Sequence, residues 1–141
     1  MSEHKCILML EDDAERLTAF REVVASLGGG YEFFSWRDAD MMVREAPQLF
    51  DQTILLSLDH DLNPTSSTAP DPGTGLDFVY YLCAHHAPFC PVILHSSNYE
   101  RVWSMHNELR FAGWQIERVG PLGTDWIQTT WQRTVRQLLG L

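Results

Sequence analysis

Five short runs of apolar and β-branched residues recur along the chain, and stretches with apolar residues at helical spacing follow them. The runs lie at residues 6–10, 31–35, 53–58 and 91–94, and a weaker one, interrupted by Glu117 and Arg118, lies at 115–119. Apolar residues then recur every three or four positions, as on one face of an α-helix, over residues 14–27, 38–46, 76–86, 102–112 and 125–139. The pattern predicts five strands that alternate with five helices. One long loop, residues 63–73, precedes the third helix.

Strands that alternate with helices imply right-handed crossovers and a parallel sheet that is covered on both faces. The expected fold is α/β and flavodoxin-like: a doubly wound, five-stranded parallel sheet in the order 2-1-3-4-5 with helices on both faces. The length of 141 residues suits one ordinary domain. A single domain over residues 1–141 is therefore expected.

Polar residues directly follow three of the predicted strands. Three acids at 11–13 follow the first strand, the sequence DHD at 59–61 follows the third, and HSSN at 95–98 follows the fourth. Charged groups at the end of a buried strand are unfavourable unless they are paired, hydrated or bound to a cation. Ligands of open α/β sheets bind beyond the carboxyl ends of the strands. The three clusters therefore predict one site at this end of the sheet.

The acids behind the first and third strands converge, because these strands are neighbours in the expected order. A few carboxylates that leave room for several waters suit Mg²⁺, and Mn²⁺ is the alternative cation. The candidate metal ligands are Glu11, Asp12 and Asp59. A simpler interpretation stays open, because acids also suit the N-terminus of a helix and Asp13 is placed to cap the first one.

The polar residues of the fourth strand and its neighbours are candidates for phosphate chemistry. Ser96 and Asn98 can hydrogen-bond a phosphoryl oxygen, and His95 can act as an acid or base. Asp61 can complete a metal shell or activate water. Thr74 is a weaker candidate for phosphate binding, because its GTG sequence lacks the ending of a P-loop. The alternative interpretation of these residues is structural: their hydroxyl and amide side chains would cap the helices that follow.

The composition limits the classes of partner. The formal charge of −9 and the pI near 4.9 argue against a general nucleic-acid coat or an anionic membrane surface. They leave open a nucleotide that binds locally through a metal. Three cysteines without a CxxC spacing favour reduced thiols in a cytoplasmic protein. The single short apolar run at the N-terminus predicts neither a signal peptide nor a membrane span.

Three segments together resemble the receiver domains of two-component signalling. These segments are LMLEDD at 8–13, LLSLD at 55–59 and PVILHSS at 91–97. The resemblance extends over nearly the whole chain. It implies that Asp59 is the phospho-acceptor at the end of the third strand and that Ser96 holds the hydroxyl position of these domains.

Two departures separate the chain from ordinary receivers. Receivers normally carry a lysine just before the proline at the end of the fifth strand, whereas here Gly120 precedes Pro121. The sequences LDHDL and HSSN are also unusual, and they resemble the divergent branch called cyclic-phosphate processing receiver domains. That resemblance implies action on cyclic phosphates of nucleotides or RNA ends. It also implies a site lined by Asp59, Asp61, His95, Ser96 and Asn98.

Three functional hypotheses follow. The first is a metal-dependent phosphoesterase that takes a phosphorylated small molecule or nucleotide, with His95 protonating the leaving oxygen. The second is a stand-alone response regulator that accepts phosphate on Asp59 from a histidine kinase. The third is an inert pseudo-receiver that only binds a partner. The missing lysine counts against the second hypothesis, and the additional His95 and Asp61 count against the third.

Overall fold

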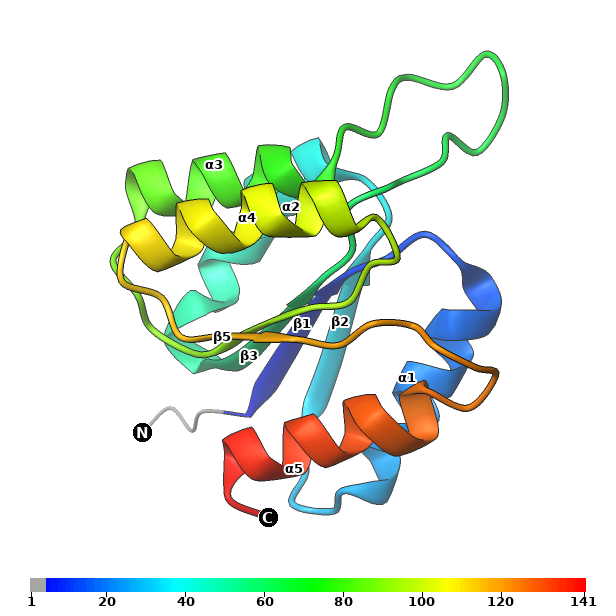
Figure 1. Ribbon diagram of the computed structural model, residues 1–141, viewed down its shortest axis with the longest axis vertical. Coiled ribbons are helices and arrows are strands. Elements are labelled where there is room, and N and C mark those ends of the chain that lie inside the picture. Colours follow the sequence, from blue (N-terminus) through cyan, green and yellow to red (C-terminus); the bar gives the residue numbers. More distant parts are fainter. Residues whose placement is uncertain (1–4) are drawn as a thin grey trace.

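A computed structural model describes residues 5–141 as a parallel sheet between two layers of helices (Figure 1). The sheet has five strands in the order β2-β1-β3-β4-β5, and all neighbouring strands pair in parallel. The predicted flavodoxin-like fold and strand order are therefore confirmed. The strands are β1 (Cys6–Leu10), β2 (Glu32–Trp36), β3 (Thr53–Leu58), β4 (Val92–Leu94) and β5 (Ile116–Arg118).

Helices cover both faces of the sheet. In Figure 1, α1 and α5 lie on one face, while α2, α3 and α4 lie on the other. Each face has its own apolar core, because successive side chains of a strand point to opposite faces. The helices are α1 (Ala14–Ser26), α2 (Ala39–Glu45), α3 (Gly75–His85), α4 (Tyr99–Phe111) and α5 (Gln132–Leu139).

Side chains just before four helices cap their N-termini, as the positions of short polar residues suggested. The predicted cap Asp13 accepts a hydrogen bond from a backbone N–H group of α1, and Asp38 accepts one from α2. Thr74 and Asn98 do the same for α3 and α4. Each cap satisfies an N–H group that has no partner within its helix.

Two segments differ from the predicted helices. Residues 46–52, beyond the predicted end of the second helix, form a 3₁₀-helix, η1 (Ala46–Gln52). The closing helix was expected to be regular over 125–139, but it starts with a π-helical segment, η2 (Ile127–Trp131). Trp126 and Trp131 would stand about 140° apart on a regular α-helix. The wider π-helical turn lets both rings pack into the core below α1.

The long loop of residues 63–73 projects away from the end of the sheet (Figure 1). Its backbone is tied to the body at both ends. The N–H group of Asn63 donates to Asp12 at 2.6 Å, and the carbonyl of Pro72 accepts from the N–H group of Ala39 at 2.7 Å. No helix within residues 5–141 has the length and apolar character needed to cross a membrane.

Candidate functional site

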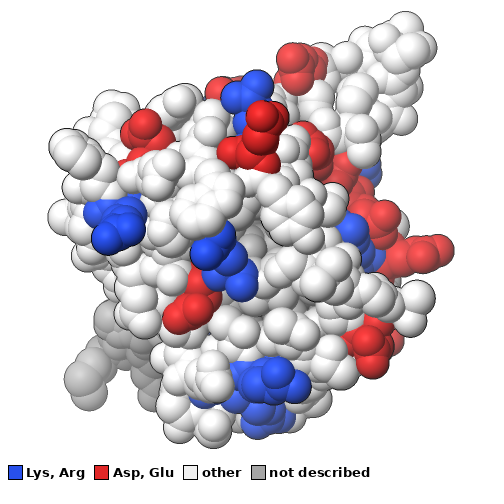
Figure 2. Space-filling model, in the orientation of Figure 1, with Lys and Arg blue, Asp and Glu red and all other residues white. Residues whose placement is uncertain are grey.

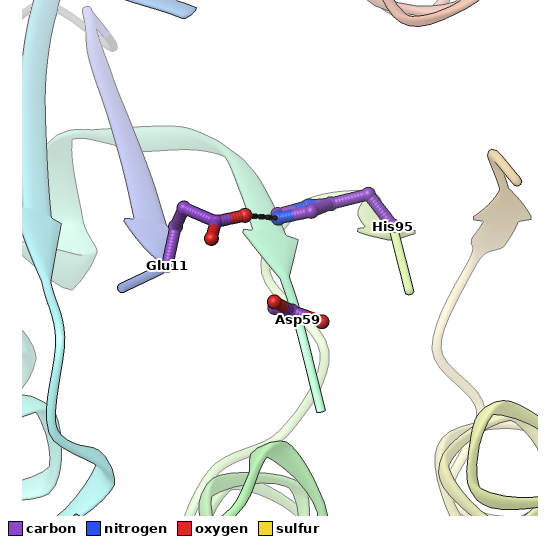
Figure 3. Close-up of side chains that lie close together, drawn as sticks. All are labelled: Glu11, Asp59 and His95. Atoms are coloured by element: carbon purple, nitrogen blue, oxygen red, sulfur yellow. Dashed lines mark hydrogen bonds and ion pairs between the residues drawn. The ribbon is translucent and has the colours of Figure 1, made fainter. Parts of the chain in front are cut away.

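The site lies where β1, β3 and β4 end, on the face of the sheet that α1 and α5 cover. Glu11, Asp59 and His95 each directly follow the last residue of their strand, and Figure 3 shows them converging. One ligand atom from each side chain lies within 4.8 Å of the others. The alternation of side chains explains this grouping, because all three continue the strand positions that face α1 and α5.

Glu11 is fully buried and fully hydrogen-bonded. Its Oε2 accepts the backbone N–H groups of Asp12 and Asp13 at 3.1 and 3.0 Å. Its Oε1 lies 3.0 Å from Nε2 of His95. Burial raises the pKa of the Glu11 carboxyl, but the hydrogen bonds from His95 and Asp13 and the charge of Arg16 outweigh it and leave the pKa below its ordinary value. Glu11 is therefore a carboxylate at neutral pH.

Asp59 is almost completely buried beside that carboxylate. Burial raises its pKa to about 6, and the charge of Glu11 adds to this shift. Its Oδ1 accepts the backbone N–H of His60 at 2.7 Å. Two carboxylates this close repel each other unless a cation lies between or beside them.

Arg16 is the cationic side chain nearest these acids among the described residues. Its Nη1 lies 3.8 Å from Glu11 Oε1 and 3.9 Å from Asp59 Oδ2. The guanidinium also lies over the ring of Trp126, 5.4 Å from its centroid. The sequence interpretation did not identify Arg16, although its place in the first turn of α1, directly behind the acids, was a usable signal.

His95 does not face an open pocket, as the expected general acid would. The side chain is fully buried, and both ring nitrogens contact protein groups. Nδ1 lies 2.7 Å from Ser57 Oγ, and Nε2 lies 3.0 Å from Glu11 Oε1. The alternation of β4 explains the difference, because it turns His95 inward against Phe20 of α1. In this structure His95 has no direct path to a substrate.

A second cluster lies on the loop after β3. His60 Nδ1 is 2.9 Å from Asp61 Oδ1, and Asn98 Nδ2 donates to Asp61 at 3.2 Å. The hydrogen bond from His60 lowers the pKa of the Asp61 carboxyl. A carboxylate accepts only, so Nδ1 of His60 carries the proton. Nε2 of His60 makes no hydrogen bond with residues 5–141. The sequence interpretation gave roles to Asp61 and Asn98 but none to His60, although His60 is part of the DHD cluster.

The remaining predicted site residues lie around these two clusters. Asp12 is not part of the close group, and its carboxylate instead holds the start of the long loop. Ser96 is nearly buried, and its Oγ accepts the backbone N–H of Asn98 at 3.2 Å, so its hydroxyl proton is available to a ligand. Thr74 forms a capping box with Asp77. Its Oγ1 accepts the N–H group of Asp77 at the start of α3, which is the structural role that the sequence left open.

The surface around the site is acidic. Figure 2 shows Asp and Glu side chains gathered along the edge between the base of the projecting loop and α1. Some Lys and Arg side chains lie among these acids, and others are scattered over this view, with one group over α5. A cation bound at the site would reduce the repulsion among these acids.

Gly75 opens α3 directly against Asp59, and we expect Gly75→Ala to disturb the site. A Cβ atom here would overlap the carbonyl oxygen of Asp59 and crowd Met105. The expected loss in the free energy of unfolding is about 1–3 kcal/mol, as for other overpacked positions. Urea unfolding measures it. Gly120→Ala is the control, because its Cβ would meet nothing closer than 3.9 Å. Equal stability of the two variants would contradict the expected overlap.

The fold and the acidic strand ends together define a receiver-type domain. Solved receivers share the fold at low sequence identity. The response regulator domain of CheB from Thermotoga maritima is 15% identical with a TM-score of 0.66, and the match covers 97% of each chain. The receiver domain of a modulated diguanylate cyclase from Desulfovibrio desulfuricans is 17% identical with a TM-score of 0.64, and the match covers 96% of this chain and 93% of that one.

A CheY-like receiver from Methanospirillum hungatei is 15% identical with a TM-score of 0.60, and the match covers 96% of this chain and 94% of that one. Residues 6–111 match the model of the cyclic-phosphate processing receiver domain, and the chain belongs to this family. No curated protein matches the chain.

Proposed function

We propose that the protein is a metal-dependent phosphoesterase that opens cyclic phosphates of nucleotides or RNA ends. The observation that carries the proposal is the pair of buried carboxylates, Glu11 and Asp59, beside the cationic Arg16 and the His60–Asp61 pair. Membership of the cyclic-phosphate processing family supports the substrate class. We further propose that residues 1–141 act as one receiver domain.

The donor set fits a hard divalent cation such as Mg²⁺ or Mn²⁺. Asp59 and Glu11 supply carboxylate oxygens, which these ions prefer, and the raised pKa of Asp59 reflects a negative charge that burial disfavours. In this proposal Asp59 and Glu11 hold the ion, and Asp12 supports it through water. When bound, Mg²⁺ would neutralise charge on the phosphate and orient the attacking water.

The chain's own groups bind the phosphate around this ion. Arg16 gives the site a positive charge that ordinary receivers take from the lysine before the proline that follows the fifth strand, where this chain has Gly120. A guanidinium suits phosphate oxygens because it presents several N–H donors in a fixed plane. The hydroxyl proton of Ser96 adds a further donor, and Asn98 holds Asp61 in place.

Hydrolysis requires a base for water and an acid for the leaving oxygen. The oxygen of water bonds to phosphorus, and the bond from phosphorus to one ribose oxygen breaks. Asp61, whose side chain is 62% exposed, takes the proton from water. His60 enters the step as an imidazolium that Asp61 holds through Nδ1–H, and it gives the proton on Nε2 to the leaving oxygen. Solvent then takes the water-derived proton from Asp61 and returns a proton to Nε2 of His60. His95 does not contact the substrate in this proposal.

His60→Gln separates the two histidines as candidates for the acid. We expect it to lower kcat for a cyclic-phosphate substrate by about 10²–10⁴-fold, as for a lost general acid, while Mg²⁺ affinity changes little. His85→Gln, near the end of α3, is the control and should leave kcat unchanged. If His60→Gln retained full kcat, the acid would have to be another group.

The second candidate function is that of a response regulator phosphorylated on Asp59 by a kinase. It is favoured by the place of Asp59 at the end of β3 and by the likeness to receivers. One of these is CheY from Borrelia burgdorferi, solved with CheX, BeF₃ and Mg²⁺, at 12% identity and a TM-score of 0.63, with 96% of this chain and 89% of that one covered.

One experiment distinguishes the two functions. The protein is incubated with 2′,3′-cyclic AMP and Mg²⁺, and in parallel with acetyl phosphate and Mg²⁺. The phosphoesterase proposal expects nucleoside monophosphate in the first reaction. Accumulation of an acyl phosphate on Asp59 in the second, with no product in the first, would favour the regulator.

Arg16→Gln tests the binding of the phosphate itself. We expect it to raise the Kd for 2′,3′-cyclic AMP about tenfold or more, since hydrogen bonds to charged groups contribute about 1.5–3 kcal/mol. Calorimetry at low temperature, with Ca²⁺ in place of Mg²⁺ to slow turnover, measures it. Arg21→Gln is the matched control, because Arg21 is also on α1 but contacts Phe33 instead of the acids. Equal affinity of both variants would exclude Arg16 from the site.

A further inference from the structure

Hydrogen-bonded side chains link the C-terminal segment to the acidic site through the core. Nε1 of Trp131 in η2 donates to Oγ of Ser57 in β3 at 3.0 Å. The same Oγ lies 2.7 Å from Nδ1 of His95. Nε2 of His95 lies 3.0 Å from Oε1 of Glu11. All four residues are fully buried, so bulk water does not reach them.

The Glu11 end of this series of hydrogen bonds fixes the position of one proton. Oε2 of Glu11 accepts two backbone N–H groups, and Nη1 of Arg16 lies 3.8 Å from Oε1, so donors surround the group and hold it as a carboxylate. A carboxylate only accepts hydrogen bonds. Nε2 of His95 must therefore carry a proton and donate it to Oε1 of Glu11.

The end at Trp131 fixes the other protons. An indole N–H can only donate, so Oγ of Ser57 accepts from Trp131. The Ser57 hydroxyl then donates its own proton to Nδ1 of His95. If Nδ1 were protonated as well, that hydroxyl proton would have no acceptor among residues 5–141, and an unsatisfied buried donor is unfavourable. The arrangement leaves His95 neutral, with its proton on Nε2.

We propose that Trp131 and Ser57 are positioning residues that hold His95 in its neutral Nε2–H form, and that His95 in turn holds the Glu11 carboxylate toward Asp59. Both ring nitrogens of His95 are then engaged. Although His95 belongs to the group within 4.8 Å, it is not a metal ligand. Such outer partners orient the ligands of metal sites and strengthen binding.

The state of His95 can be measured without any assumption about function. Long-range ¹H–¹⁵N correlation spectra of the ¹⁵N-labelled protein at pH 7 report both ring nitrogens, and His95→Gln identifies the signals. We expect Nδ1 in the range of an unprotonated acceptor and Nε2 in the range of a protonated nitrogen. Protonation of Nδ1, alone or together with Nε2, would overturn the proposal.

Two variants interrupt this series of hydrogen bonds, and a third serves as their matched control. Ser57→Ala and Trp131→Phe each remove one link. Trp114→Phe is the control, because Trp114 is also a buried indole, but its Nε1 has no hydrogen-bond partner in the described chain. We expect the first two variants to move the His95 ¹⁵N signals and the control to leave them in place.

Affinity for Mg²⁺ is the second readout, and this half of the inference rests on the proposed function. Loss of an outer partner typically weakens metal binding about 10–100-fold, so Ser57→Ala and Trp131→Phe should raise the Kd for Mg²⁺ by about that factor. Trp114→Phe should leave it within about twofold. A wild-type protein that binds no Mg²⁺ would refute the metal site of the proposed function, while the His95 signals would still decide the tautomer.

A role limited to packing makes a different prediction. It predicts that Ser57→Ala, a small change that leaves the tryptophan in place, alters neither the His95 signals nor the Kd for Mg²⁺. That result would overturn the proposal. If Trp131→Phe does not fold, Ser57→Ala and the wild-type spectrum still decide it.

Discussion

Asp59→Asn is expected to lower Mg²⁺-dependent turnover of a 2′,3′-cyclic nucleotide by about 10³-fold or more. The substitution removes the carboxylate at the end of β3 that would hold the ion, and a metal contributes several kcal/mol to a phosphoryl transition state, with each 1.36 kcal/mol worth about tenfold in rate. The shape of the side chain and its hydrogen bond to the backbone N–H of His60 are kept.

Asp40→Asn is the control for that experiment. Asp40 lies on α2, where it is exposed and pairs with Arg44 at 3.2 Å. Its substitution removes the same charge from the opposite face of the sheet, and kcat/KM should stay within about twofold. A similar loss of rate in both variants would show that general charge, and not the Asp59 ligand, governs turnover.

Asp59→Asn is also expected to stabilise the metal-free protein at neutral pH. The pKa of Asp59 is raised from 3.8 to about 6 in the folded state, so the unfolded chain loses this proton more easily. The contribution of Asp59 to stability is therefore most favourable below about pH 4 and becomes less favourable as pH rises toward 6. Asp59→Asn removes this loss, and the gain at pH 7 has an upper bound of about 3 kcal/mol.

Urea unfolding of both proteins at pH 4, 5, 6 and 7, with a chelator present, measures the effect. The difference in the free energy of unfolding should grow over this window and vanish at its acid end. Saturating Mg²⁺ should reverse the order at pH 7, because an ion that binds only the folded wild type stabilises it. A variant that is less stable than wild type at pH 7 without metal would mean that Asp59 is structural.

The sequence was sufficient to predict the sheet, because β1, β3 and β4 are compact apolar runs and α1 to α4 each begin at a polar cap. The runs of β1 and β3, followed at once by Glu11 and Asp59, also predicted the end of the sheet at which these side chains converge. These predictions depend only on local patterns and on the rule that ligands bind beyond strand carboxyl ends.

The roles of individual side chains were harder to predict, because they depend on contacts between distant elements. Trp131 meets Ser57 across 74 positions of the chain, and no local pattern indicates that pairing. A serine inside the otherwise apolar run TILLSL was a signal of a buried polar contact, but it did not identify the partner. His95 was assigned to the pocket because the sequence places it beside Ser96, whereas alternation along β4 turns the two side chains to opposite faces.

The most direct test follows the phosphorus atom of the substrate. ³¹P NMR of 2′,3′-cyclic AMP with the wild-type protein distinguishes a cyclic diester from a monoester in one spectrum. With Mg²⁺ present, the cyclic signal should be replaced by that of a monoester, and the conversion should stop with a chelator or with Asp59→Asn. A cyclic signal that persists unchanged with wild-type protein and Mg²⁺, for the 2′,3′-cyclic phosphates of all four nucleosides and of an RNA end, would contradict the proposed phosphoesterase.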